Sequence, residues 1–311
     1  MGAGGATRRR LVAVVGATCS GKTGLAVSLA EALQGELVNA DSRQAIAEVS
    51  VGVCKPTALE LRGVPCHGLD WRHLGEPFTV ADFVTRARTC LADLWGRSRL
   101  PILVGGSGMY VRALLEGFDF GGVGPASEVG FTSASGGDST PSMEVDALLA
   151  LDPGMAARVD LRNPRRVTRA LEVARAGAEP SRADQGWDAV RIGCQVDTEV
   201  LKARIRSRSE LIVGPALQGE VEALLALGYT PWTIASSAIG YAEALAWNQA
   251  QCTREEAVKR LTARTWKYAR TQLTWLRTEP NVVWIDASED TKGMVAACRS
   301  ALESRWQQEH S

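Results

Sequence analysis

Short apolar runs recur along the chain and are separated by stretches whose apolar residues fall at helical spacing. Runs of this length, rich in β-branched residues and followed by polar or glycine-rich turns, are typical of strands buried in a parallel sheet. The predicted strands cover residues Leu11–Val15, Glu36–Asn39, Leu100–Val104, Ala189–Val196 and Asn281–Asp286.

Helices are predicted between these strands, and several have recognisable first turns. Thr79 with Asp82 suits a capped helix start, and Thr253-Arg-Glu-Glu256 is a capping box. Residues 56–77 carry glycines and prolines that break any periodicity, so we expect irregular structure there. The predicted helices cover 24–33, 78–94, a short segment ending near 116, 143–151, a segment opened by Asn163-Pro164, 197–208, about 216–227, about 253–277, and 291 onward.

Strands that alternate with helices indicate an α/β fold in which helices cover both faces of a parallel sheet. The composition changes after Gly117, and residues 121–142 are rich in glycine, serine and threonine, which predicts a loop. We therefore predict a sheet-forming core in two parts, 1–117 and 187–311, with a smaller, mostly helical insertion at 118–186.

Bulk composition narrows the class of protein. The 311 residues are 45% hydrophobic and 23% charged, and Lys+Arg equals Asp+Glu at 35 each, so a nucleic-acid partner must be held by a local basic patch. The seven cysteines are scattered, with no C-x-x-C pair, which is typical of reduced thiols. No apolar run reaches the ~18–20 residues of a membrane span. These features predict a cytoplasmic protein with no membrane partner.

The strongest local signal is Gly16-Ala-Thr-Cys-Ser-Gly-Lys22-Thr23, which fits the phosphate-binding pattern G-x-x-x-x-G-K-[ST]. A predicted strand precedes this motif and a predicted helix follows it. That context lets backbone N–H groups and the helix N-terminus converge on an anion, while Lys22 adds a charge and the Thr23 hydroxyl can bind Mg²⁺. The segment therefore predicts a P-loop and a phosphorylated ligand.

Two further groups follow predicted strands at the edge where open α/β sheets bind ligands. Asp41 is a candidate general base or metal-organising carboxylate, although a simple capping acid fits its position equally well. Ser107 lies in the second glycine loop, Gly105-Gly-Ser-Gly108, whose backbone can approach an oxyanion closely. A plain tight turn is the alternative for that loop.

Basic residues form two clusters. The helix predicted at 253–277 carries Arg260, Arg264, Lys267 and Arg270, interleaved with Trp266, Tyr268 and Trp275, and the helix after Asn163 carries Arg165, Arg166 and Arg169. Basic side chains fix phosphates and aromatic rings stack on unpaired bases, which would suit RNA. The alternative is a solvated basic face with the aromatic rings in the core.

Taken together, the motifs of this chain resemble those of the tRNA dimethylallyltransferases, also called isopentenyl-tRNA transferases. The matching segments occur in the family's order and cover nearly the whole chain. They are Gly16–Thr23, Asn39–Gln44, Cys54–Pro56, Phe78–Phe83, Pro101–Tyr110, Arg112–Gly117, Asn163–Glu172, Ala238–Tyr241 and Tyr268–Trp275.

The resemblance implies transfer of a dimethylallyl group from dimethylallyl diphosphate to the exocyclic N6 of the adenine beside the anticodon of tRNA. It implies that Asp41 takes the N6 proton and that Ser107 contacts the oxygen between the prenyl group and the diphosphate. Thr23 would help to hold the cofactor Mg²⁺, which neutralises the leaving group. The diphosphate-binding residues implied are Gly16, Ala17, Thr18, Cys19, Ser20, Gly21, Lys22, Thr23 and Arg270, and the acceptor-binding residues are Ser42, Gln44, Arg165, Arg166, Arg169, Arg264 and Lys267.

The chain departs from the family pattern at a few positions. Ala17 replaces a proline, Ser107 a threonine, and Ser237 and Thr271 stand where basic residues are usual. The insertion also carries a Gly/Ser stretch in place of its first charged helix. Three alternatives therefore stay open. They are the same transfer onto a free adenine nucleotide or other small acceptor, a P-loop small-molecule kinase, and an inactive RNA-binding paralogue.

Overall fold

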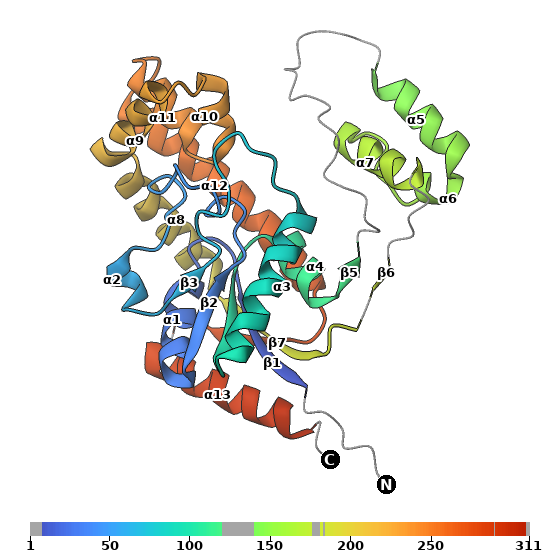
Figure 1. Ribbon diagram of the computed structural model, residues 1–311. Helices are drawn as coiled ribbons and strands as arrows, with labels where there is room; N and C mark the ends of the chain where they lie inside the picture. The colour runs from blue at the N-terminus through green and yellow to red at the C-terminus, as the bar shows by residue number, and fades with distance from the viewer. Residues whose placement is uncertain (1–7, 120–139, 176–180, 183, 289, 309–311) are drawn as a thin grey trace. The chain divides into compact units, whose positions relative to one another are not determined.

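A six-stranded parallel sheet is the centre of the fold (Figure 1). The computed structural model describes residues 8–119, 140–175, 181–182, 184–288 and 290–308. The strand order is β3-β2-β4-β1-β7-β8, and every neighbouring pair is parallel. The strands are β1 (Arg9–Val15), β2 (Gly35–Asn39), β3 (Cys66–His67), β4 (Leu100–Gly105), β7 (Trp187–Gln195) and β8 (Val282–Asp286).

Strand β1 lies in the interior of this sheet and is paired on both sides. Its register with β4 sets Val15 against Gly105, and its register with β7 sets Val15 against Gly193. On the next strand, Asn39 of β2 is opposite Val104. Because the strands are parallel, their carboxyl ends meet at one edge, so the loops after β1, β2 and β4 start side by side.

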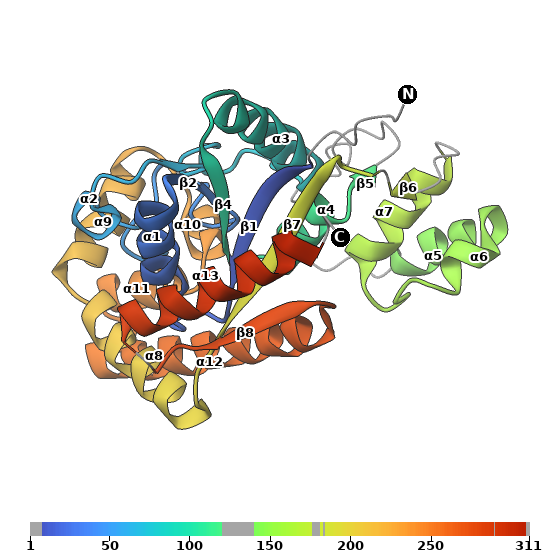
Figure 2. The same cartoon turned by 90° about the horizontal axis from the view of Figure 1, so that it is seen from below.

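Two helices cover one face of the sheet. Helix α1 (Lys22–Leu33) and helix α13 (Thr291–Gln308) share a core cluster with alternate residues of the strands, including Val12, Ile102 and Ile192. Figure 2 shows α13 crossing β1 and β7. Burying both faces explains why the strands read as continuous apolar runs rather than as alternating ones.

The intervening strand residues, such as Ala13 and Leu103, point to the other face and are also fully buried. Helix α3 (Val80–Gly96) and helix α4 (Gly108–Leu115) bury apolar side chains of their own, and the Phe83 ring stacks on that of Tyr110 with centroids 4.3 Å apart. The predicted α/β fold, a parallel sheet covered by helices, is confirmed.

A group of helices follows β7 in the chain. Helices α9 to α11 share a core cluster with Ile46 and Val49, the residues that come after β2. The long α12 begins with the predicted capping box of Thr253 and Glu256. The bounds are α8 (Thr198–Ile212), α9 (Pro215–Ala226), α10 (Pro231–Ser237), α11 (Tyr241–Asn248) and α12 (Arg254–Thr278).

The remaining described residues form a second compact unit, which comprises residues 77–82 and 115–185. Its core includes Leu148, Ala156 and Val167, contributed by three helices. A two-stranded antiparallel ladder joins Phe118 to Arg182. The elements are β5 (Phe118–Asp119), α5 (Thr140–Leu151), α6 (Pro153–Ala156), α7 (Pro164–Arg175) and β6 (Ser181–Arg182). Most of the predicted Gly/Ser loop, residues 121–139, lies outside the described residues, and α5 begins three residues earlier than predicted.

The sequence missed several short elements. Residues 56–77, predicted to be irregular, contain α2 (Ala58–Leu61) and β3. Helices α10 and α11 were not predicted either. These helices are too short to show a clear helical periodicity in the sequence. Helix α2 is stabilised locally by the capping box of Thr57 and Glu60.

A substitution at Gly105, where the second glycine loop begins, tests how closely the ends of β2 and β4 approach each other. A Cβ on Gly105 would come within 2.2 Å of the Ala40 carbonyl oxygen, whereas a Cβ on Gly96, in α3, meets nothing within 4 Å. We expect Gly105→Ala to lower the free energy of unfolding by about 1–3 kcal/mol. Gly96→Ala is the matched control and should change it by less than about 0.5 kcal/mol in the same urea titration. Equal stability of the two variants would mean that the loops are further apart than the structure has them.

Candidate functional site

A cavity of about 490 Å³ opens at the carboxyl edge of the sheet. The loops after β1 and β2, the end of β4 and the first turn of α1 contribute to its wall, together with residues of helices α8, α10 and α12. Its polar lining includes Thr18, Lys22, Thr23, Asp41, Ser42, Arg43, Gln44, Arg208, Arg264 and Tyr268. The cavity therefore brings together seven of the predicted site residues, from segments far apart in the chain: Thr18, Lys22, Thr23, Asp41, Ser42, Gln44 and Arg264.

The glycine loop that connects β1 to α1 turns sharply. Cys19 and Gly21 have positive φ values, 64° and 90°, which turn the loop back over the start of α1. No side chain caps α1, so the N–H groups of its first turn keep their capacity to bind a ligand.

Lys22 lies at that helix start, and its Nζ donates to the Ala17 carbonyl at 3.3 Å. Burial lowers the pKa of Lys22, and the nearby Asp41 carboxylate opposes that change. A buried ammonium that borders a cavity binds an anion strongly, because little water competes for it. An anion in the cavity would also offset the cost of keeping this charge buried.

Asp41 comes two residues after the end of β2 and is half-buried. Its backbone N–H donates to Asn39 Oδ1 at 3.2 Å, and its Oδ1 accepts the Arg43 backbone N–H at 2.9 Å. Its Oδ2 accepts no hydrogen bond from the described part of the chain. One oxygen thus fixes the carboxylate while the other remains able to accept a proton.

The second glycine loop holds Ser107 against the segment that carries Asp41. The Ser107 Oγ accepts the Ser42 backbone N–H at 3.0 Å, and the Ser107 N–H donates to the Ala40 carbonyl at 3.2 Å. These bonds join the loops after β2 and β4. The structure therefore brings Asp41, Ser42 and Ser107 together, although 65 residues separate the two serines in sequence.

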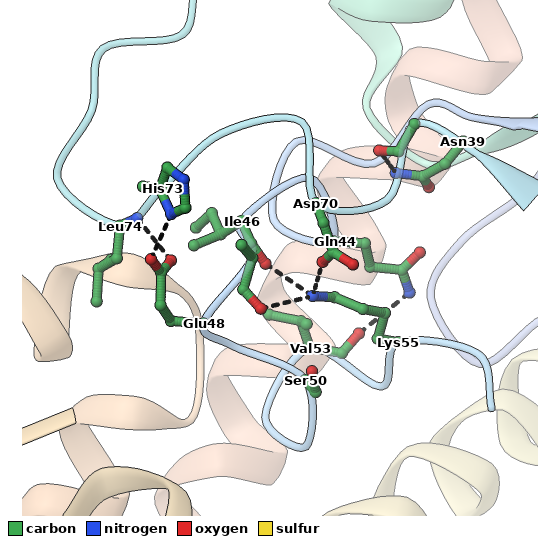
Figure 3. A network of polar contacts seen from close by, with 12 residues as sticks. Asn39, Gln44, Ile46, Glu48, Ser50, Val53, Lys55, Asp70, His73 and Leu74 are labelled. Carbon is green, nitrogen blue, oxygen red and sulfur yellow. Dashed lines mark hydrogen bonds and ion pairs between the residues drawn. The ribbon is translucent and has the colours of Figure 1, made fainter. Parts of the chain in front are cut away.

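Gln44 belongs to a polar network that shapes the cavity wall (Figure 3). Its Nε2 donates to the carbonyls of Val53 and Cys54 at 3.2 and 2.9 Å. In the same network, Lys55 Nζ donates to the Ile46 carbonyl at 2.7 Å and pairs with Asp70. The amide of Gln44 therefore positions residues of the wall, and its carbonyl oxygen remains for a ligand.

The half-buried Glu220 and the buried Tyr241 hold the turn that precedes Val53. The Glu220 carboxylate accepts the backbone N–H groups of Ser50 and Val51 and the hydroxyl of Tyr241, the shortest contacts being 2.6 Å. Tyr241 leaves no room for a side chain at Gly52, where a Cβ would lie 2.4 Å from its ring. The wall of the cavity is thus rigidly supported.

Arg208 and Gln272 were not predicted to contribute to the site, and Tyr268 was predicted only as one of three aromatic rings that could stack on bases. Arg208 of α8 lines the cavity, and its charge acts on Lys22. Tyr268 of α12 also lines it, and burial raises the pKa of Tyr268 to about 12, with a further rise from Asp41. Gln272 lies one turn further along α12 and contacts both glycine loops. Arg208 is the last residue of a predicted helix, and Tyr268 and Gln272 lie in the segment Tyr268–Trp275. Their spacing along the sequence does not indicate that these side chains face the strand ends.

The predicted basic face of α12 divides into two kinds of residue. Arg264 lines the cavity and pairs with the buried Glu243 at 2.7 Å, whereas Lys267 and Arg270 are exposed and are not among the lining residues. Trp266 packs on the cluster of Leu201 and Ala269, and Trp275 fills the space beside Gly108. Of the three aromatic rings proposed to stack on bases, only that of Tyr268 borders the cavity.

The second basic cluster lies on α7, in the smaller unit. Arg166 is exposed, and Arg169 pairs with Glu172 at 3.0 Å. The side chain of Arg165 lies outside the described residues. The role in acceptor binding implied for these three arginines stays a prediction.

The chain is similar in sequence to proteins of a known family. A model of the IPP transferase family matches residues 44–279, which is most of the chain. The chain belongs to the IPP transferase family. It is 38% identical over 284 residues to a tRNA dimethylallyltransferase of Nocardioides, with 89% of this chain and 91% of the relative covered. It is 40% identical over 295 residues to one of Anaeromyxobacter dehalogenans, with 92% and 97% covered.

Solved structures of the IPP transferase family share the fold. The tRNA isopentenylpyrophosphate transferase of Bacillus halodurans matches with a TM-score of 0.70 and 31% identity, covering 98% of this chain and all of that one. A eukaryotic dimethylallyltransferase acting on tRNA matches with a TM-score of 0.76 at 22% identity, covering 90% and 74%, and shows the same fold. Among the described residues, no helix is both long and apolar enough to cross a membrane.

Proposed function

We propose that this protein transfers a dimethylallyl group from dimethylallyl diphosphate to the exocyclic N6 of an adenine in tRNA. The observation that carries the proposal is the shared cavity, which is lined both by the glycine loop after β1 and by the carboxylate of Asp41 after β2, two strands away in the sheet. The family supports prenyl transfer as the use of that pairing, because its members named above are tRNA dimethylallyltransferases.

The diphosphate would bind at the start of α1. Its oxygens would accept the backbone N–H groups of the P-loop, and Lys22 and Arg208 would balance its negative charge. Arg208 is thus added to the residues implied by the resemblance, and Arg270 stays a prediction because it lies outside the lining. These charges stabilise pyrophosphate as it departs, which is the costly part of breaking the C–O bond.

Mg²⁺ fits this site as an ion bound mainly by phosphate oxygens of the substrate rather than by a set of protein ligands. The described residues contain no group of three or more acidic, histidine or cysteine side chains that could hold a metal alone. Mg²⁺ commonly takes one or two protein oxygens and completes its shell with phosphate oxygens and water. The Thr23 hydroxyl, on the first turn of α1 and in the lining, is the protein oxygen we propose. When bound, the ion would neutralise charge on the leaving diphosphate.

Asp41 would supply the general base. In the reaction, the N6 nitrogen forms a bond to the first carbon of the prenyl chain while the bond from that carbon to the diphosphate oxygen breaks. Pyrophosphate carries away the electron pair, and the N6 proton passes to Oδ2 of Asp41. The Ser107 hydroxyl, which accepts the Ser42 backbone N–H, would contact the bridging oxygen.

The family favours tRNA over the other acceptors. An adenine beside the anticodon must leave its stack to react, which suits a cavity that accepts one base. Ser42 and Gln44 line that cavity and would contact the extruded base, and Arg264 borders the same space. The kinase and the inactive paralogue are not favoured, because the relatives across nearly the full length of this chain are named for prenyl transfer.

The test is a paired acceptor assay with the full chain, Mg²⁺ and labelled dimethylallyl diphosphate. We expect label to enter unmodified tRNA and no label to enter AMP, ADP or ATP. Label in the nucleotides alone would overturn the tRNA assignment. Label in none of them, with consumption of ATP instead, would overturn prenyl transfer and favour the kinase.

The exposed cations of α12 allow a separate prediction about RNA binding. We expect the double substitution Lys267→Glu and Arg270→Glu to weaken tRNA binding at least about tenfold at low salt, because phosphate contacts release counterions. The slope of log affinity against log salt should also fall by about one for each lost contact. Lys292→Glu with Arg299→Glu, exposed on α13, is the matched control. Equal losses in both double variants would mean that α12 has no special role.

A further inference from the structure

Gln272 is a buried polar side chain that joins the two glycine loops of the site. Its Oε1 accepts the Thr18 backbone N–H at 2.8 Å, and its Nε2 donates to the Gly106 carbonyl at 3.0 Å. It is 5% exposed, and 254 and 166 residues separate it from these two partners. One amide therefore bridges the loop after β1 and the loop after β4.

The space around this bridge is tight. A Cβ on Gly106 would lie 2.2 Å from Gln272 Nε2 and 3.3 Å from the Gly16 carbonyl oxygen. The two loops thus approach each other with the amide of Gln272 filling the gap between them. Neither loop can shift towards the other without displacing that side chain.

The chemistry of the bridge is specific to a carboxamide. One loop offers a donor and the other an acceptor, so a single side chain must accept at one end and donate at the other. A buried N–H or carbonyl that lost this partner would carry a desolvation penalty. Tyr268, one turn earlier on α12, faces Gln272 and Ser107, and with its pKa near 12 it stays a neutral phenol at working pH.

We infer that Gln272 is a positioning residue that fixes the separation between the diphosphate-binding loop and the loop that carries Ser107. It touches no reacting atom and acts through the Thr18 amide and the Gly106 carbonyl. This inference rests on the proposed function, in which the diphosphate binds at the first loop and Ser107 of the second loop contacts the oxygen that joins it to the prenyl group. These groups must be held at a fixed distance, and a small displacement lowers turnover sharply.

Two variants separate positioning from simple loss of packing. Gln272→Met keeps the volume and removes both hydrogen bonds. Gln272→Glu keeps the Thr18 bond, but at neutral pH its carboxylate opposes the Gly106 carbonyl. Protonation of that carboxyl restores a donor. Thr274→Val, which removes an exposed hydroxyl bonded to the Arg270 carbonyl on the same helix, is the matched control.

The experiment measures kcat and KM for dimethylallyl diphosphate with tRNA as acceptor, after the fraction of folded protein in each preparation is determined. We expect kcat to fall about 10–100-fold in Gln272→Met, while KM changes less than kcat and Thr274→Val stays within twofold of the unsubstituted protein. We expect the rate of Gln272→Glu, divided by that of the unsubstituted protein, to rise as pH falls from 8 to 6. Taking this ratio cancels any pH dependence that both proteins share.

Three outcomes would overturn the inference. They are a kcat of Gln272→Met within twofold of normal, a loss explained fully by the fraction unfolded, and a Gln272→Glu ratio that does not change with pH. If the unsubstituted protein transfers nothing to tRNA, the proposed function fails, and binding of magnesium pyrophosphate then decides the inference. Affinity at least fivefold weaker in Gln272→Met than in Thr274→Val would support the bridge, and equal affinity would overturn it.

Discussion

The site depends on the parallel pairing of β1 with β4 and of β4 with β2. That pairing sets Val15 opposite Gly105 and Asn39 opposite Val104. The loops after β1, β2 and β4 therefore begin at the same edge of the sheet. The glycine loop after β1 and the Asp41 carboxylate are thereby brought to one cavity, and Ser107 is held against Ser42 beside it. Close approach of these loops has a steric requirement as well, because Gly105 and Gly106 have no room for a Cβ.

Charge within the cavity is balanced by its own residues and by the ligand that we propose. Lys22 and Arg208 repel each other, and Asp41 offsets part of that cost. The Arg43 guanidinium donates to the Ser237 carbonyl at 2.8 Å, next to a position where the resemblance implies a basic residue. The segment between Asn39 and Gln44 thus supplies a carboxylate, a serine and a cation to the same cavity.

The strand, glycine loop and helix at the start of the fold could be predicted because their signals are local. Leu11–Val15, the glycine motif and the helix after it are contiguous, and each has a physical reason to adopt its structure. The roles of Arg208, Tyr268 and Gln272 could not be predicted in the same way, because they depend on how α8 and α12 pack over the strand ends. Spacing along α12 grouped Arg264 with Lys267 and Arg270 as one basic face. In the folded chain, only Arg264 of these three residues lines the cavity.

The central claim is that the cavity has a diphosphate side and an acceptor side with separate chemistry. The most direct test measures the affinity for magnesium pyrophosphate and the single-turnover rate of transfer to tRNA in Asp41→Asn and in Lys22→Ala. The account predicts that Asp41→Asn loses about 100-fold or more in rate, as expected for a general base, with affinity within threefold. It predicts that Lys22→Ala weakens affinity at least about tenfold. A rate within tenfold of normal in Asp41→Asn, or unchanged affinity in Lys22→Ala, would contradict it.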